Sequence, residues 1–139
     1  MHIAFIGGGT MAEAILNGML EKKLAAPSDI AVVEPVEARR AHLTQCYNVV
    51  TTDDAKTATA SGDIIVLAVK PQDLPYAMAG LKGTLTANQA VLSIVAGVRI
   101  DAITAGLGHA AVIRVMPNTP AQIGAAASVW TATSEVTAE

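Results

Sequence analysis

The sequence is poor in cysteine, in aromatic side chains and in charge. Its 139 residues include one cysteine, Cys46, so neither a disulfide framework nor a cysteine metal site is expected. Aromatic residues make up 3% of the chain, which argues against a platform on which nucleic-acid bases stack. Charged residues make up 15% and the net charge is −3. The basic residues are scattered along the chain, and the adjacent Arg39 and Arg40 do not make a stripe, so we expect no nucleic-acid partner.

Signals for secretion or membrane insertion are also missing. No lysine or arginine precedes the first apolar run, which argues against a signal peptide. The uncharged apolar stretch 87–98 is too short to span a bilayer and contains polar side chains. With a single cysteine, the expected compartment is a reducing cytoplasm, without a membrane partner or a bound metal.

Hydrophobic residues, by contrast, make up 52% of the chain. This length fits one domain, and the composition suits a parallel sheet covered on both faces or a surface covered by something else. We expect strands over 3–6, 30–33, 48–51, 63–69, 90–95, 110–115 and 124–132, and helices over 10–23, 36–45, 55–60, 74–81 and 99–107. The last connection is too short for a crossover helix, so the final strand is predicted to be antiparallel. The predicted fold is an α/β, Rossmann-type, doubly wound sheet.

The chain is organised around a glycine turn near its start. The apolar run 3–6 leads into Gly7, Gly8 and Gly9, and a helical pattern follows at once. The spacing Gly7-x-Gly9-x-x-Ala12 is the alanine-ending form of the dinucleotide fingerprint. Backbone can approach a pyrophosphate at such a turn, and the helix N-terminus offers unpaired N–H groups. The alternative is a glycine-rich turn in an α/β domain that binds no nucleotide.

Charged residues near the second predicted strand bear on which nucleotide would bind. Glu34 lies 25 residues after Gly9, where an acid accepts hydrogen bonds from the adenosine ribose in NAD-binding folds. Arg39 and Arg40 follow on the next helix and could instead pair with the 2′-phosphate of NADP. A solvated acid with two solvated arginines is the third possibility, so these residues leave NAD and NADP open.

Three further motifs follow predicted strands, where ligands of open parallel sheets bind. The four motifs together are Gly7-Gly8-Gly9-Thr10-Met11-Ala12-Glu13-Ala14, Ala68-Val69-Lys70-Pro71-Gln72, Ser93-Ile94-Val95-Ala96-Gly97-Val98 and Arg114-Val115-Met116-Pro117-Asn118-Thr119-Pro120. In this order and spacing they resemble the pyrroline-5-carboxylate reductases, over the whole chain. The resemblance implies reduction of 1-pyrroline-5-carboxylate to L-proline by hydride transfer from NADPH or NADH.

The resemblance also assigns roles to individual positions. The residues expected at the cofactor are Ile6, Gly7, Gly8, Gly9, Thr10, Met11, Glu34, Arg39, Asp54, Ala68, Val69, Lys70, Pro71, Ala96 and Gly97. Those expected in the loop facing the substrate are Met116, Asn118, Thr119 and Pro120. Neither the residues nor the resemblance identifies a catalytic acid or base in this chain.

Two departures from the family pattern put a preference for NADP in doubt. Glu34-Pro35 stands where many members carry a small polar residue or an arginine-bearing loop for the 2′-phosphate. Asp54 stands where members often have an asparagine that contacts the adenosine, and it is also a candidate N-cap for the helix over 55–60.

The family implies a second, helical domain that forms the dimer and makes most substrate contacts. We therefore expect an NAD(P)-binding domain over residues 1–132 and the start of a linker over 133–139. On this view the chain is a truncation, a proteolytic remnant or a natural short form. The alternatives are another imine or β-hydroxyacid reductase of the superfamily, and a nucleotide-binding module without catalysis.

Overall fold

A computed structural model describes residues 1–117 and 128–137. The elements are β1 (Ile3–Ile6), α1 (Thr10–Glu21), β2 (Ile30–Val33), α2 (Glu37–Tyr47), β3 (Val50–Thr52), α3 (Ala55–Ala60), β4 (Ile64–Leu67), α4 (Leu74–Leu81), β5 (Ala90–Ser93), α5 (Ile100–Leu107), β6 (Val112–Pro117) and β7 (Ser128–Ala132). Short 3₁₀ helices span Pro27–Asp29 and Pro71–Asp73.

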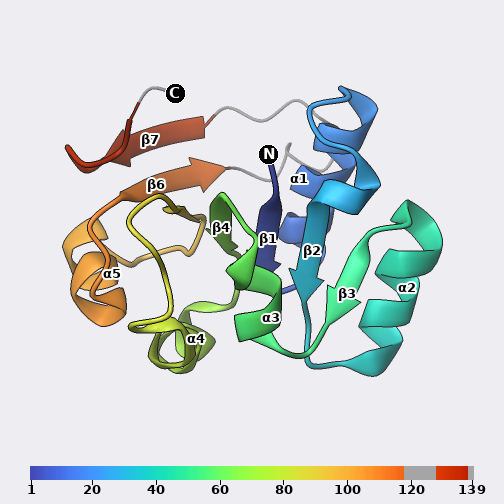
Figure 1. Ribbon diagram of the computed structural model, residues 1–139, viewed down its shortest axis with the longest axis horizontal. Coiled ribbons are helices and arrows are strands. Elements are labelled where there is room, and N and C mark those ends of the chain that lie inside the picture. Colours follow the sequence, from blue (N-terminus) through green and yellow to red (C-terminus); the bar gives the residue numbers. More distant parts are fainter. Residues whose placement is uncertain (118–127, 138–139) are drawn as a thin grey trace.

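The strands form one sheet in the order β3-β2-β1-β4-β5-β6-β7 (Figure 1). Strands β1 to β6 pair in parallel, and β7 pairs with β6 in the opposite direction. The strand order reverses at β1, which lies between β2 and β4. The doubly wound prediction and its antiparallel final strand are therefore confirmed.

Helices cover both faces of the sheet because alternate strand residues point in opposite directions. On one face, Phe5 and Val32 pack with Leu16 of α1 and Leu43 of α2. On the other face, the apolar cluster joins strand residues to α3, α4 and α5. All four residues of β1 are buried, which explains why this strand reads as a continuous apolar run.

Several predicted ends are displaced by a few residues. The predicted helix 36–45 continues to Tyr47, where Asn48 adopts a left-handed conformation (φ 57°) and ends it. The following strand consequently begins at Val50 rather than at residue 48. The predicted strand 63–69 ends at Leu67, because the chain then turns into the 3₁₀ helix that begins at Pro71.

The last two strands also differ from their predicted bounds. β6 reaches Pro117 rather than residue 115, because β7 extends the pairing, with Pro117 opposite Ser128. The predicted final strand 124–132 is confirmed from residue 128 onward, and its first four residues lie outside the described ranges.

Candidate functional site

The carboxyl ends of the central strands are joined by backbone hydrogen bonds at the glycine turn. The N–H of Gly7 donates to the carbonyl of Val33 (2.9 Å), which links the turn to the end of β2. The N–H of Ala68 donates to the carbonyl of Ile6 (2.9 Å), which links the same turn to the end of β4. Three of the segments expected at the cofactor therefore meet at one edge of the sheet.

Gly7 is required because the backbone of a neighbouring strand end lies against it, and Gly8 lies close to neighbouring side chains. Gly7 has φ +102°, and a Cβ there would lie 2.7 Å from the carbonyl oxygen of Ala68. A Cβ on Gly8 would lie 2.8 Å from the Leu43 side chain and 3.2 Å from a carboxylate oxygen of Glu34. Both positions hold the turn against its neighbours, and a larger residue at Gly7 would force the backbone apart.

Gly9 differs because a Cβ there would meet no atom within 4 Å. It is the N-cap residue of α1, and no side chain of the described residues caps this helix end. Gly9 and Thr10 are both exposed. Among the described residues, the helix end with its partial positive charge is therefore left without a side-chain cap, an arrangement suited to accepting a phosphate.

These geometries predict that substitution of Gly7 mainly lowers stability, whereas substitution of Gly9 mainly lowers nucleotide binding. Gly7→Ala should lower the free energy of unfolding by about 2 kcal/mol or more, because of its positive φ and the contact with Ala68. Gly9→Val should cost no more than about 1 kcal/mol of stability but should abolish nucleotide binding. Urea denaturation and a fluorescence titration with NADPH and NADH measure the two effects. Normal nucleotide binding by Gly9→Val would contradict the assignment of the turn.

The carboxylate of Glu34 lies beside the glycine turn and is held through both oxygens. Oε2 accepts the N–H of Gly8 (3.0 Å), and Oε1 accepts the N–H of Val36 (3.0 Å). The side chain is half-buried. Glu34 thus stands at the end of β2 with a fixed orientation, which the sequence position alone does not specify.

The two arginines of α2 contact acceptors within the chain. Arg39 donates from Nε to the carbonyl of Gly8 (2.6 Å) and forms an ion pair with Glu13. Arg40 donates from one guanidinium nitrogen to the carbonyls of Glu34 (2.7 Å) and Pro35 (2.9 Å). The structure thus places Arg39 beside the glycine turn and Arg40 beside the segment after β2, with partners that sequence reasoning did not identify.

Glu13, in the first turn of α1, is the centre of a polar cluster that sequence reasoning missed. It accepts hydrogen bonds from Arg39 and from the Tyr47 hydroxyl (2.8 Å), and His42 Nε2 lies 2.8 Å from its Oε1. Burial opposes ionisation, but these hydrogen bonds and the Arg39 charge outweigh it and lower the pKa of Glu13 to about 2. Burial and the bond to Glu13 raise the pKa of Tyr47 to about 12.

The lowered pKa makes part of the stability dependent on acid. Ionised Glu13 stabilises the fold above about pH 4.5, and this contribution is lost as the pH falls toward 2. When the pH falls from 5 to 2, the free energy of unfolding should drop for the unsubstituted chain. For Glu13→Gln, which has no carboxyl to protonate at this position, the drop should be smaller by about 2 kcal/mol. Urea denaturation across this range tests the difference, with Glu21→Gln on the exposed end of α1 as control. Equal losses for all three proteins would contradict the cluster's role.

The remaining predicted cofactor residues lie along the same edge. Lys70 is exposed directly before the 3₁₀ helix that Pro71 begins. Ala96 and Gly97 are exposed after β5, and Gly97 has φ +73°. Asp54 follows β3 and caps α3 by accepting the N–H of Lys56 (3.0 Å), which confirms its predicted N-cap role. Its hydrogen bond from Thr57 lowers the pKa of this carboxyl.

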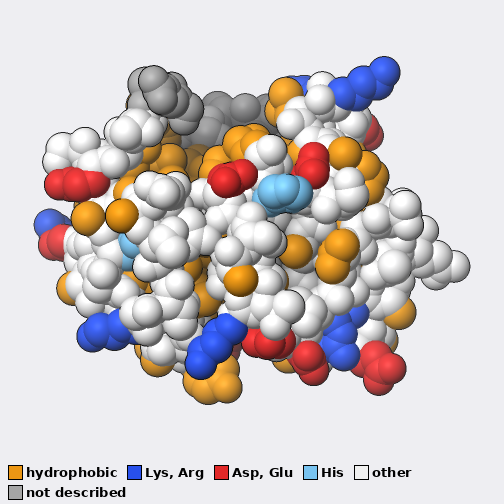
Figure 2. Space-filling view, viewed as in Figure 1, with side chains coloured by type: hydrophobic (Ala, Val, Ile, Leu, Met, Phe, Trp, Pro, Cys, Tyr) orange, Lys and Arg blue, Asp and Glu red, His pale blue; other side chains and the backbone are white. Residues whose placement is uncertain are grey.

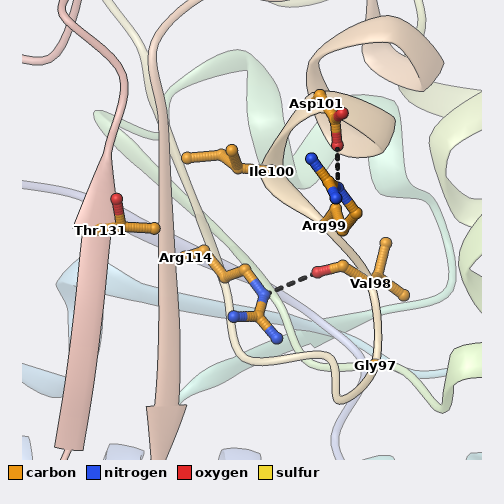
Figure 3. A pocket seen from close by; sticks show the side chains of 7 residues that line it. All are labelled: Gly97, Val98, Arg99, Ile100, Asp101, Arg114 and Thr131. Carbon is orange, nitrogen blue, oxygen red and sulfur yellow. Dashed lines mark hydrogen bonds and ion pairs between the residues drawn. The ribbon is translucent and has the colours of Figure 1, made fainter.

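A pocket between β6 and the segment after β5 contains a second residue without a predicted role, Arg114 (Figure 3). Its side chain points from β6 toward this segment, and its Nε donates to the carbonyl of Val98 (2.6 Å). Arg99 and Asp101 form an ion pair at the rim (3.2 Å). Arg114 thus ties the predicted nicotinamide segment to the strand that leads to the predicted substrate loop.

The substrate loop itself is only partly described. Met116 is half-buried and pairs with Val129 across β6 and β7. Asn118, Thr119 and Pro120 lie outside the described residues.

On the face shown in Figure 2, Lys and Arg side chains lie apart, with acidic and hydrophobic ones between them. Among the described residues, no helix combines the length and apolar character needed to cross a membrane.

Comparisons with known proteins agree with this fold. The chain is 43% identical over 125 residues to a pyrroline-5-carboxylate reductase from Synechocystis sp.. This match covers 90% of this chain and 46% of that relative. The structure of a pyrroline-5-carboxylate reductase from Coxiella burnetii matches with a TM-score of 0.93 at 33% identity, over 99% of this chain and 51% of that one. The chain thus spans about half the length of these relatives.

A further solved structure shares the fold, and a family model identifies the wider family. A Plasmodium falciparum pyrroline carboxylate reductase with NADP bound has the same fold, with a TM-score of 0.86 at 22% identity over 99% of this chain and 50% of that one. A family model described as NADP oxidoreductase coenzyme F420-dependent matches residues 2–97. Since this match covers more than half of the chain and contains the glycine turn, the chain belongs to the NADP oxidoreductase coenzyme F420-dependent family.

Proposed function

We propose that the chain is the cofactor-binding part of a pyrroline-5-carboxylate reductase, which reduces 1-pyrroline-5-carboxylate to L-proline with NADPH or NADH. The observation that carries the proposal is the 43% identity to such an enzyme through 90% of the chain. At this identity the match extends beyond the Rossmann architecture, which alone would not specify a substrate.

The geometry of the turn fits a dinucleotide. A Cβ at Gly9 would project into the open space before α1, so glycine leaves that space to a pyrophosphate. The backbone N–H groups of Thr10 and Met11 would bind it. Glu34 lies at the ribose end and the Ala96-Gly97 segment at the nicotinamide end.

The reaction adds a hydride to the carbon of a C=N bond and a proton to its nitrogen. A bound dihydronicotinamide supplies the hydride. The chain's own contribution is to orient the reactants and exclude water. The exposed small residues Ala96 and Gly97 allow close approach of a flat ring. Arg114 fixes this segment through Val98, and Met116 with Asn118, Thr119 and Pro120 would face the substrate.

The proposal extends to the organisation of the enzyme. Residues 1–132 form the NAD(P)-binding domain, and residues 133–139 begin the linker to a helical domain that supplies the dimer interface and most of the substrate pocket. This chain spans about half the length of its relatives, and the other half of those relatives is long enough to contain such a domain. We place the enzyme in the cytoplasm, in agreement with the single exposed cysteine.

A titration followed by an assay tests the proposal. The chain should bind NADPH or NADH, and the fluorescence of the nicotinamide measures this binding. The Gly9→Val variant should bind neither nucleotide. An assay with 1-pyrroline-5-carboxylate then separates two cases: turnover indicates a complete active site, and binding without turnover indicates the cofactor-binding part alone. Failure to bind either nucleotide would contradict the proposal.

A further inference from the structure

The end of β2 presents one fixed negative charge where the adenosine ribose of a dinucleotide would lie. Glu34 is anchored through Oε2 to the N–H of Gly8 and through Oε1 to the N–H of Val36, both at 3.0 Å. Two backbone anchors on adjacent segments leave the carboxylate little freedom to turn away. Each carboxylate oxygen retains a further lone pair with which to accept an O–H group.

The positive charges nearby are directed elsewhere. Arg39 has only 28% of its side chain exposed and is divided between the Gly8 carbonyl and Glu13. Arg40 binds the carbonyls of Glu34 and Pro35 from one guanidinium nitrogen. A phosphate that recruited Arg39 would have to compete with these existing acceptors, whereas Arg40 is held on the backbone through one of its guanidinium nitrogens. Arg39 would in addition have to give up or share an ion pair in a half-buried site.

We infer that this chain selects a dinucleotide with a free ribose 2′-hydroxyl, NADH rather than NADPH, and that Glu34 is the residue that determines this specificity. The inference rests on the proposed function, since it concerns the same site. A 2′-hydroxyl donates a hydrogen bond to the fixed carboxylate. A 2′-phosphate, with a charge of about −2 at neutral pH, meets a like charge that cannot withdraw. The chain thus departs from the NADP that its family description names.

Two cofactor fragments test the ribose end alone. ADP-ribose and 2′-phospho-ADP-ribose share the adenosine and the pyrophosphate and differ only at the 2′ position. By isothermal titration calorimetry, ADP-ribose should bind at least about tenfold more tightly at low salt. The ratio should shrink as salt is added, because screening weakens the repulsion. NADH and NADPH should show the same order by nicotinamide fluorescence.

A charge-removing substitution with a matched control isolates Glu34. Glu34→Gln keeps the size of the side chain and removes its charge, so the ratio of the two affinities should fall toward one. Any shared loss of pyrophosphate affinity from a disturbed turn cancels in this ratio. Glu37→Gln removes an exposed charge from the first turn of α2 and should leave the ratio unchanged.

The outcomes separate this inference from the proposal beneath it. Equal or tighter binding of 2′-phospho-ADP-ribose by the unsubstituted chain would overturn the specificity and leave dinucleotide binding intact. An unchanged ratio in Glu34→Gln would overturn the role of Glu34. Failure of both fragments and both cofactors to bind would overturn dinucleotide binding, and the specificity with it.

Discussion

The close approach of Gly7 to the carbonyl of Ala68 is the constraint on which the site depends. It brings the end of β1 against the end of β4, leaving no room for a side chain. Hydrogen bonds from Gly7 to Val33 and from Ala68 to Ile6 hold the carboxyl ends of β1, β2 and β4 side by side. The direction in which α1 leaves the sheet follows from this turn, and with it the position of the helix N-terminus.

The polar contacts around the turn extend this arrangement to α2. Glu34 binds the N–H of Gly8, and Arg39 binds its carbonyl. Arg39 also pairs with Glu13 of α1, and Glu13 is contacted by His42 from the middle of α2 and by Tyr47 from its C-terminal end. A buried or half-buried network of this kind is costly when one member is removed. The same residues therefore stabilise the α1–α2 contact and border the proposed ribose end of the site.

The sequence predicted the fold because its signals are local and periodic. Continuous apolar runs such as 64–67 indicate buried strands, and the glycine turn indicates the first crossover. Element ends were less accurate, since the left-handed Asn48 and the β6–β7 pairing depend on contacts beyond the local pattern. The partners of Arg39 depend on how α1 and α2 cross, and those of Arg114 on where the loop after β5 folds. Spacing contains neither piece of information.

The N-terminus of α1 is proposed to hold the pyrophosphate of a dinucleotide. Amide chemical shifts of the ¹⁵N-labelled chain, followed by NMR during a titration with ADP-ribose, test it most directly. The largest changes should fall on the amides of Gly8, Gly9, Thr10 and Met11. Changes confined to other parts of the sheet edge, with these four amides unmoved at saturation, would contradict it.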